Sequence, residues 1–261
     1  MSQGAIRELF DRWRGLTRSS LLYEETPIRK TPLAHGEIAT LIQKESPTIL
    51  EIGCNDGTDT LAFLRVMPEA RIYCFEPDPR AVKRFKARMG PYLDKVKLFE
   101  VAITDRTGQI DFHQSSGDDL PDGLDLPDGL DLPDGWDFSG SIRRPKNHLK
   151  EHPWVKFEKT ITVSTCRLDD WSAENGVEQV DFIWMDVQGA EGDVIAGASK
   201  ILKHTRFLYT EYSNTETYEG QLSLQALLAQ LPSFDVIARR PEDVLLRNKK
   251  FRMAGASRWP F

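Results

Sequence analysis

A hydrophobic run that carries one acidic residue and is followed by two glycines constrains this chain more than any other stretch. After Ile49–Ile52 come Gly53 and Gly57, and an amphipathic segment begins at Thr58. This order predicts a strand, a tight turn and the start of a helix, an arrangement that binds nucleotides in α/β proteins. We expect Gly53 to form the turn and Gly57 to leave room at the helix N-terminus, whose free N–H groups favour anionic or carboxylate groups.

The spacing of these glycines narrows the choice of ligand. A dinucleotide site needs G-x-G-x-x-G and a triphosphate loop needs G-x-x-x-x-G-K-[ST], whereas the chain reads E-x-G-x-x-x-G from Glu51 to Gly57. The missing middle glycine argues against a pyrophosphate on the turn, and no lysine follows to bind a triphosphate. A nucleoside with an amino-acid tail fits better, which points to S-adenosylmethionine. An ordinary turn without a ligand remains the alternative.

Composition excludes a general attraction to nucleic acids or membrane surfaces. The formal net charge is −6, but residues 118–137 hold eight aspartates and no basic residue, so the rest of the chain sums to −6 + 8 = +2. Neither total is typical of a protein that binds polyanions. With 261 residues, of which 40% are hydrophobic, the chain can form a sizeable core.

Cysteines and hydrophobic segments indicate a soluble protein of a reducing compartment. Cys54, Cys74 and Cys166 are far apart and lack C-x-x-C spacing, so neither a disulfide framework nor a zinc site is expected. No apolar run approaches the about 20 residues that a membrane-spanning helix needs. The first residues do not resemble a signal peptide. We therefore expect a cytoplasmic protein without a membrane span.

Strands and helices alternate along the chain as in a parallel sheet covered on both faces. Strands are predicted at 49–52, 71–75, 96–103, 180–185 and 207–210, with an edge pair at 109–113 and 160–165 and an antiparallel hairpin at 234–239 and 243–247. Helical periodicity is found at 5–16 and 38–42, after Thr58, at 79–89, from Arg167, before Lys203 and at 222–228. The pattern predicts an α/β fold.

One stretch breaks this alternation. Residues 120–137 read LPDGLD, LPDGLD and LPDGWD, and proline and glycine in every six residues exclude a helix or a continuous strand. We interpret 117–138 as an exposed insertion of turns, since a calcium site would need a closing glutamate. The predicted organisation is an N-terminal helical segment (1–47), a main domain (48–250) and a basic tail (251–261).

Acidic residues stand at the ends of several predicted strands. In an open parallel sheet, ligands bind beyond the carboxyl ends of the strands, where the strand order reverses. Glu76, Asp186 and Glu211 occupy such positions. Glu76 can accept hydrogen bonds from both hydroxyls of a ribose, and its alternative role is a charge near a helix N-terminus. Residues 101–103 would then flank the adenine.

Five blocks resemble the FkbM family of S-adenosylmethionine-dependent methyltransferases. In chain order they are ILEIGCNDGTDT, FEPDPRAVKRFK, VAITDRTGQIDF, CRLDDW and DFIWMDVQGAEGDVIAGA. The resemblance implies a Rossmann-like fold of about seven strands and O-methylation of sugars or natural products. The expected fold is therefore α/β and Rossmann-like, a seven-stranded, mostly parallel sheet with an antiparallel edge hairpin and helices on both faces.

The same resemblance implies a cofactor site and shows two departures from the family pattern. By position, the cofactor-binding residues are Glu51, Gly53, Asn55, Asp56, Gly57, Asp59, Glu76, Pro77, Ala102, Ile103 and Asp186. The family block K-x-D-x-E-G has Trp184 in place of the lysine and Gln188 in place of the glutamate. If that lysine aids acceptor binding or catalysis in the family, other groups must do so here.

Methyl transfer to an alcohol requires alignment of donor and acceptor and removal of a proton. Asp186 and Glu211, at adjacent strand ends, are candidate bases. Glu191 is a further catalytic candidate, with a favourable charge in the first turn of a helix as its alternative role. The carboxylates could instead hold Mg²⁺, an option that we do not favour.

Further side chains are candidates for the acceptor side. His113, His148 and His152 could act as a base, but we interpret them as isolated surface histidines. Residues 140–144 are expected to fold over the cleft, where an arginine would meet an anionic acceptor. Core packing is expected for Tyr209.

The leading hypothesis is a methyltransferase that acts on a hydroxyl of a sugar or a natural-product-like small molecule, without a nucleic acid partner. The helix expected at 5–16 could pack on the core or form a homodimer contact. A second hypothesis, motivated by Trp184 and Gln188, is a catalytically impaired cofactor-binding interaction module. A nicotinamide-dependent oxidoreductase is disfavoured by the turn spacing. The sequence does not identify the acceptor.

Overall fold

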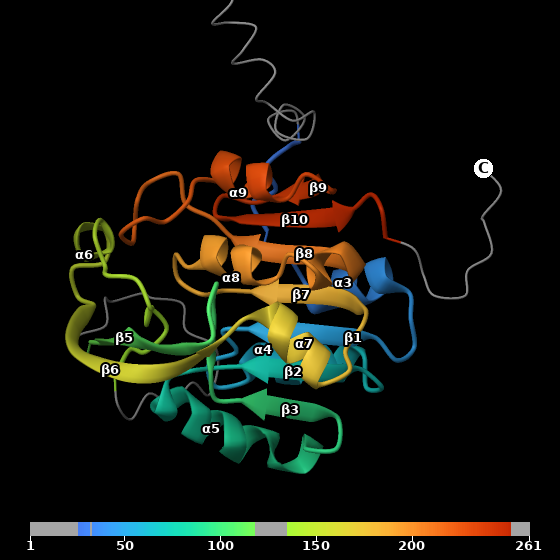
Figure 1. Ribbon diagram of the computed structural model, residues 1–261, viewed down its shortest axis with the longest axis horizontal. Coiled ribbons are helices and arrows are strands. Elements are labelled where there is room, and N and C mark those ends of the chain that lie inside the picture. The colour runs from blue at the N-terminus through green and yellow to red at the C-terminus, as the bar shows by residue number, and fades with distance from the viewer. Residues whose placement is uncertain (1–25, 32, 118–134, 252–261) are drawn as a thin grey trace, which may run out of the picture.

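A seven-stranded sheet with the strand order β3-β2-β1-β7-β8-β10-β9 forms the centre of the molecule (Figure 1). The protein is described by a computed structural model that covers residues 26–31, 33–117 and 135–251. The strands are β1 (Thr48–Ile52), β2 (Arg71–Phe75), β3 (Val96–Phe99), β7 (Val180–Met185), β8 (Thr205–Glu211), β9 (Phe234–Arg239) and β10 (Asp243–Asn248). The first five are parallel to one another, and β10 is antiparallel to both β8 and β9. The predicted mostly parallel sheet with an antiparallel edge hairpin is confirmed.

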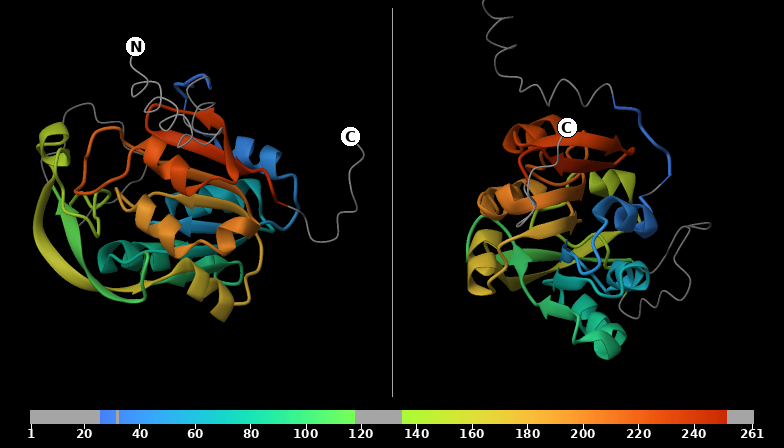
Figure 2. Two further views of the ribbon diagram at one scale, coloured as in Figure 1. Left: turned by 45° about the horizontal axis from the view of Figure 1, so that its top comes forward. Right: turned by 90° about the vertical axis from the view of Figure 1, so that its right-hand side faces the viewer.

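Helices cover both faces of this sheet (Figure 2). One face packs against α3 (His35–Ile42), α4 (Thr58–Val66) and α5 (Pro79–Met89), and the other against α7 (Leu168–Glu174), α8 (Glu191–Gly197) and α9 (Leu224–Gln230). The sheet separates two clusters of buried hydrophobic side chains, so each face has a core of its own. No helix in the described part of the chain is long and apolar enough to cross a membrane.

The helix α5 begins where the sequence predicts it. Pro79 occupies the first turn, where its missing N–H costs nothing, and the side chain of Asp78 accepts a hydrogen bond from the backbone N–H of Arg80. Phe85 and Met89 are buried on the side that faces the sheet. The opposite, charged face of this helix is part of the site described below.

A second sheet of three strands extends from one end of the first. It consists of β4 (Ala102–Ile103), β6 (Lys156–Cys166) and β5 (Gly108–Ser116) in that order. The predicted pairing of 109–113 with 160–165 is confirmed, since Gln109 lies opposite Ser164 and His113 opposite Thr160.

Two predicted elements are shorter than expected. The strand expected over 96–103 divides into β3 and β4, because the N–H of Val101 turns back to the carbonyl of Phe99 and the following residues pair with β6. The helix expected to reach Lys203 ends at Gly197. A separate 3₁₀ turn, η2 (Ile201–His204), follows, and the carboxylate of Asp169 caps its first N–H groups.

The order of the main sheet reverses between β1 and β7. The chain leaves β3, passes through the three-stranded sheet and returns at β7 beside β1. The carboxyl ends of β1 and β7 therefore mark the place where a ligand is expected to bind. Three predictions lie outside the described residues: the helix at 5–16 with its suggested dimer contact, most of the LPDGLD repeat, and nearly all of the basic tail.

Candidate functional site

A narrow cavity of about 640 Å³ opens at this reversal point, beyond the carboxyl ends of β1, β2 and β7. Its walls come from the strand ends, from β4 and β5, and from residues 135–142, which we call the covering segment. The lining residues are Ile52, Gly53, Asn55, Phe75, Glu76, Pro77, Val101, Ala102, Ile103, Phe112, Asp137, Phe138, Gly140, Ile142, Asp186, Val187, Gln188 and Ala190.

The turn after β1 brings two strand ends into contact. Gly53 has a φ of 85°, and a Cβ atom at this position would lie 1.8 Å from the backbone oxygen of Asp186. The N–H of Gly53 donates to the carbonyl of Phe75, and the N–H of Asp186 donates to the carbonyl of Ile52. Only glycine fits here, because both the conformation and the close approach exclude a side chain.

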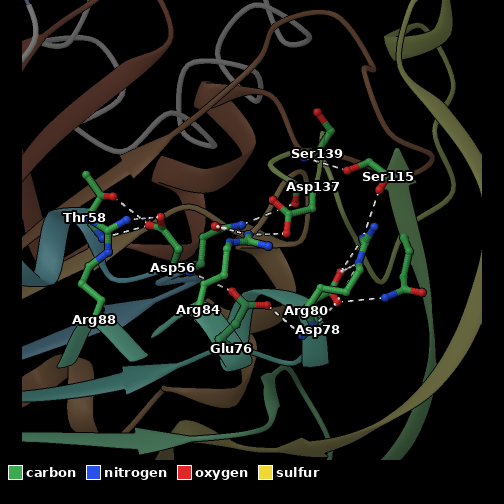
Figure 3. Close-up of polar contacts among 12 residues, drawn as sticks. Asp56, Thr58, Glu76, Asp78, Arg80, Arg84, Arg88, Ser115, Asp137 and Ser139 are labelled. Carbon is green, nitrogen blue, oxygen red and sulfur yellow. Dashed lines mark hydrogen bonds and ion pairs between the residues drawn. The ribbon is translucent and has the colours of Figure 1, made fainter. Parts of the chain in front are cut away.

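The carboxylate of Glu76 is buried at the end of β2 (Figure 3). One oxygen accepts a hydrogen bond from the backbone N–H of Asn55 at 2.9 Å and the other from that of Asp78 at 2.8 Å. Burial raises the pKa of Glu76 to about 8, with a smaller contribution from the charges of Asp78 and Asp137. Each oxygen has a lone pair left for a hydroxyl donor.

An apolar slot lies beside Glu76. Ala102 and Ile103 of β4, Phe75 of β2 and Phe112 of β5 form its walls, and all four are nearly inaccessible to solvent. Ile142 of the covering segment contributes to the same wall. The dimensions and apolar character suit a flat heteroaromatic ring next to a polar group.

The covering segment is fixed at several points. The N–H of Ser139 donates to the hydroxyl of Ser115 at 3.1 Å, and Ser141 exchanges backbone hydrogen bonds with His113. Farther along, Arg143 binds the carboxylate of Asp193 at 2.7 Å. The prediction that residues 140–144 fold over the cleft is confirmed for Gly140 and Ile142. Arg143 is held by Asp193 and does not line the narrow cavity.

Three arginines on one face of α5 hold aspartates around the narrow cavity (Figure 3). Arg80 pairs with Asp78 at 2.7 Å, and Arg88 pairs with Asp56 at 2.6 Å. Between them, Arg84 pairs with Asp137 of the covering segment. Helix α5 therefore connects the turn between β1 and α4, the end of β2 and the covering segment.

A wider cavity of about 1320 Å³ adjoins the narrow one, and we call it the acidic cavity. It is lined by Trp136, Phe138, Ser139, His148, Glu151, His152, Asp186, Gln188, Gly189, Glu211, Tyr212, Ser213, Thr215, Thr217, Tyr218, Gln221 and Glu242. This lining has four carboxylates and, among the described residues, no lysine or arginine. Phe138, Asp186 and Gln188 line both cavities.

The side chain of Gln188 joins the two strand-end carboxylates. Its amide N–H group donates to Asp186 at 2.7 Å and to Glu211 at 3.3 Å, and its oxygen accepts from the hydroxyl of Tyr218 at 2.8 Å. Burial raises the pKa of Asp186 to about 6. Burial, followed by the charge of Asp186, raises the pKa of Glu211 well above its usual value. Both carboxyl groups therefore keep their protons to a higher pH than exposed carboxyl groups do.

The interpretation of the histidines as surface residues is wrong for His148. Only 3% of this residue is exposed, and it lines the acidic cavity between the rings of His152, Phe157 and Tyr218. The physical reason is a short helix, α6 (His148–Glu151), whose first N–H is bonded to the carbonyl of Thr217. Burial lowers the pKa of His148 to about 4, so the imidazole is neutral at pH 7.

Seven of the predicted site residues line the narrow cavity: Gly53, Asn55, Glu76, Pro77, Ala102, Ile103 and Asp186. Glu211 lines the acidic cavity. Five line neither cavity: Glu51, Asp56, Gly57, Asp59 and Glu191.

Each of these five has a different environment. Glu51 is buried and accepts a hydrogen bond from Thr60, and Asp56 caps the turn at Thr58. Gly57, with a φ of 81°, lies against the ring of Phe85. Asp59 is half-exposed near His35. Glu191 is buried at the start of α8 and accepts a hydrogen bond from the N–H of Gly189 at 3.1 Å, and burial raises its pKa to about 7.

Sequence reasoning missed Asp137 and Arg84. The four-residue spacing of Arg80, Arg84 and Arg88 indicates that they share a helix face, but it does not name their partners. The sequence distinguishes the last repeat unit only by Trp136, which stands where the other units have leucine. No cluster of three or more metal-binding side chains occurs within the described ranges.

Known proteins resemble this chain over most of its length. The profile of the methyltransferase FkbM domain matches residues 51–252. The 2-O-methyltransferase NoeI of Sinorhizobium fredii is 56% identical over 220 residues, which cover 83% of this chain and 85% of NoeI. The AMB antimetabolite synthetase AmbE of Pseudomonas aeruginosa is 26% identical over 70% of this chain but only 9% of AmbE.

A crystal structure of an rRNA methylase from Streptococcus thermophilus is 12% identical, covers 82% of this chain and 93% of that protein, and has a TM-score of 0.43.

Proposed function

The chain belongs to the FkbM methyltransferase family and is an S-adenosylmethionine-dependent O-methyltransferase; on that premise we propose that it methylates a hydroxyl of an uncharged small molecule bound in the acidic cavity. The observation that carries the proposal is the position of Asp186. Its side chain lies where the narrow cavity and the acidic cavity meet. A proton acceptor for the reaction is needed at this junction, because donor and acceptor must meet there.

The narrow cavity fits the nucleoside of the cofactor. Glu76 offers two carboxylate oxygens to a ribose diol, and the slot formed with Ala102 and Ile103 suits an adenine ring. The bare backbone at Gly53 leaves room for the amino-acid tail. The cofactor supplies an electrophilic methyl group on a sulfonium. The methyltransferase domain is proposed to span 48–250, as the sequence predicted.

The protein residues align the acceptor and remove its proton. An acceptor hydroxyl within hydrogen-bond reach of Asp186 would form a bond to the methyl carbon while the sulfur–methyl bond breaks, and the proton would pass to the carboxylate. Gln188 holds that carboxylate in place at 2.7 Å. Burial and the charge of Asp186 raise the pKa of Glu211 well above its usual value, so we assign the proton of the pair to Glu211 and the negative charge to Asp186.

The lining of the acidic cavity favours a neutral acceptor. Glu151, Glu242 and the single charge of the Asp186–Glu211 pair, with no lysine or arginine among the described lining residues, would repel a phosphate or a carboxylate on the acceptor. Trp136, Phe138 and Tyr212 offer aromatic surfaces, on which the apolar face of a sugar ring or a natural product packs. The name of the relative NoeI, a 2-O-methyltransferase, supports a hydroxyl acceptor.

Substitution of Asp186→Asn tests the proposal. Loss of the base is expected to lower kcat about 10²- to 10⁴-fold, while the Kd for S-adenosylhomocysteine stays within about 3-fold, since the ribose and adenine contacts remain. Methyl transfer from labelled S-adenosylmethionine is measured on matched neutral glycosides and on the corresponding uronic acids. Unchanged activity of the variant, or a preference for the uronic acids, would contradict the proposal.

The alternative of a catalytically impaired binding module is tested by the same assay. It was motivated by Trp184 and Gln188. Trp184 lines neither cavity and packs instead against Tyr209 and His35 on the side of α3. Gln188 binds both carboxylates. Neither replacement removes a group from the proposed reaction, so we expect turnover.

A further inference from the structure

The Arg84–Asp137 pair carries buried polar atoms that have no hydrogen-bond partner among the described residues. Nε and Nη1 of Arg84 and Oδ1 of Asp137 are inaccessible to solvent and form no hydrogen bond with any described residue. In the neighbouring pair, Arg88 has one such atom and Asp56 has none. An unsatisfied buried polar atom costs about 1–3 kcal/mol, so three in a single ion pair call for a ligand.

The unpaired atoms lie next to the proposed ribose site (Figure 3). Asp137 lines the narrow cavity together with Glu76, and the charge of Asp137 contributes to the raised pKa of Glu76. Asn55 connects the two acids, because its backbone N–H donates to Glu76 and its side-chain amide donates to the carbonyl of Asp137 at 3.4 Å. Arg84 donates to the oxygen of the same amide at 3.3 Å.

We propose that Asp137 and Arg84 form the second half of the ribose site, so that the cis-diol of the cofactor is held between Glu76 on β2 and Asp137 on the covering segment. This inference rests on the proposed binding of the nucleoside in the narrow cavity. Oδ1 of Asp137 accepts from one hydroxyl, Glu76 accepts from the other, and a free N–H of Arg84 donates to a hydroxyl oxygen.

A vicinal diol matches this set of atoms better than the other parts of the cofactor do. Each hydroxyl both donates and accepts a hydrogen bond, and the pair offers an unused acceptor on Asp137 beside unused donors on Arg84. The carboxylate of the amino-acid tail would be repelled by the carboxylate of Asp137. The adenine has an apolar slot of its own beside Ala102 and Ile103.

A role in fixing the covering segment is the competing explanation. The pair then would only fasten residues 135–142 to α5, as Asp193 fastens Arg143 to α8. The two explanations differ in their dependence on the ribose hydroxyls. A diol contact is lost when a hydroxyl is removed from the ligand, whereas a purely structural contact does not depend on the ligand.

The experiment measures Kd by isothermal titration calorimetry for S-adenosylhomocysteine and for its 2′-deoxy and 3′-deoxy analogues. Wild-type protein is expected to bind at least one deoxy analogue about 10-fold or more weakly. The Asp137→Asn variant is expected to bind S-adenosylhomocysteine about 10- to 100-fold more weakly, because a charge-assisted hydrogen bond is lost. It should bind that deoxy analogue within about 3-fold of wild type.

Two further variants complete the design. Asp193→Asn removes a different anchor, at Arg143 directly after the covering segment, and should weaken all three ligands equally or not at all. Arg84→Lys keeps the positive charge without the spare N–H groups. Its loss of affinity relative to wild type should also be smaller for that deoxy analogue than for S-adenosylhomocysteine. It provides the test if circular dichroism shows that Asp137→Asn does not fold.

Equal losses for S-adenosylhomocysteine and both analogues in Asp137→Asn and Arg84→Lys would overturn the proposal and leave a structural role. Equal affinity of the wild type for all three ligands would overturn it as well. Absence of any binding by the wild type would instead refute the proposed function on which the inference rests.

Discussion

On the β2 side of the site, the buried carboxylates of Asp56, Asp78 and Asp137 are each paired with an arginine of α5. On the β8 side, the carboxylates of Asp186 and Glu211 share the amide of one glutamine. The first arrangement balances charge with charge, and the arginines fix the positions of the carboxylates. The second leaves charge uncompensated, so the carboxyl groups respond to it by binding protons. One edge of a single sheet thus has a half suited to recognition and a half suited to proton transfer.

The largest effect is expected where the two halves touch. In Gly53→Ala, the new methyl group would collide with the backbone oxygen of Asp186, 1.8 Å away, in a conformation with a φ of 85°. We expect a loss of at least about 3 kcal/mol in the free energy of unfolding, together with loss of S-adenosylhomocysteine binding. Urea denaturation and calorimetry measure both. Gly176→Ala, at a φ of 63° with open space around it, is the control for conformation without collision; an equal loss there would show that contact between the halves is unimportant.

Glu76 differs from the three aspartates of the β2 side, which are each paired with an arginine. Its carboxyl group is held by backbone N–H groups and has no arginine partner in the described part of the chain. Its pKa of about 8 in the folded protein exceeds the value of 4.5 for an exposed glutamate. The folded protein therefore binds a proton that the unfolded chain releases, and stability falls as pH rises from about 4.5 to about 8.

Glu76→Gln should remove this contribution, which amounts to at most about 5 kcal/mol. Urea denaturation at pH 5 and at pH 8 gives the pH dependence for wild type and variant. Relative to wild type, the variant should gain stability at pH 8. An identical pH dependence for both proteins would mean that Glu76 ionises normally.

Gln188→Glu should sharpen the contrast by adding a third carboxyl group to the β8 side. Repulsion should raise the pKa of Asp186, so the rise of kcat with pH, expected near pH 6 in the wild type, should move up by about one unit. Glu211→Gln replaces a carboxyl group that is already neutral and keeps a hydrogen-bond donor beside Asp186, so it should leave the same rise near pH 6. A pH–rate profile of each variant measures the shift, and an equal displacement in both variants would argue against charge repulsion as its cause.

The two halves also differ in how far the sequence predicts them. Hydrophobic runs and strand-end acids identify β1, β2 and β7 and bring Gly53, Glu76 and Asp186 to one edge, because parallel strands end on the same side. Asn55, Pro77, Ala102 and Ile103, which also line the narrow cavity, were predicted because they lie next to strand ends in the chain. The burial of His148 depends on α6 docking beside Tyr218, a contact between residues 70 positions apart.

Side chains on the predicted elements were assigned less reliably than the elements themselves. Glu51 is the first residue of the E-x-G-x-x-x-G motif from which the cofactor site was predicted. Its side chain is nevertheless buried and hydrogen-bonded to Thr60 of α4. Alternation along a strand sends every second residue to the other face, and the sequence does not say which face carries the ligand. Asp137 pairs with Arg84 across 53 positions, for which no local pattern exists.

The ends of the segment that holds the LPDGLD copies are joined by a hydrogen bond from the N–H of Trp136 to the carbonyl of Gly117, at 3.1 Å. The chain thus leaves and re-enters this part of the molecule at two positions that are hydrogen-bonded to each other. A gain or loss of one copy would therefore change the length of the chain by six residues between two points that already meet, next to Asp137 on α5.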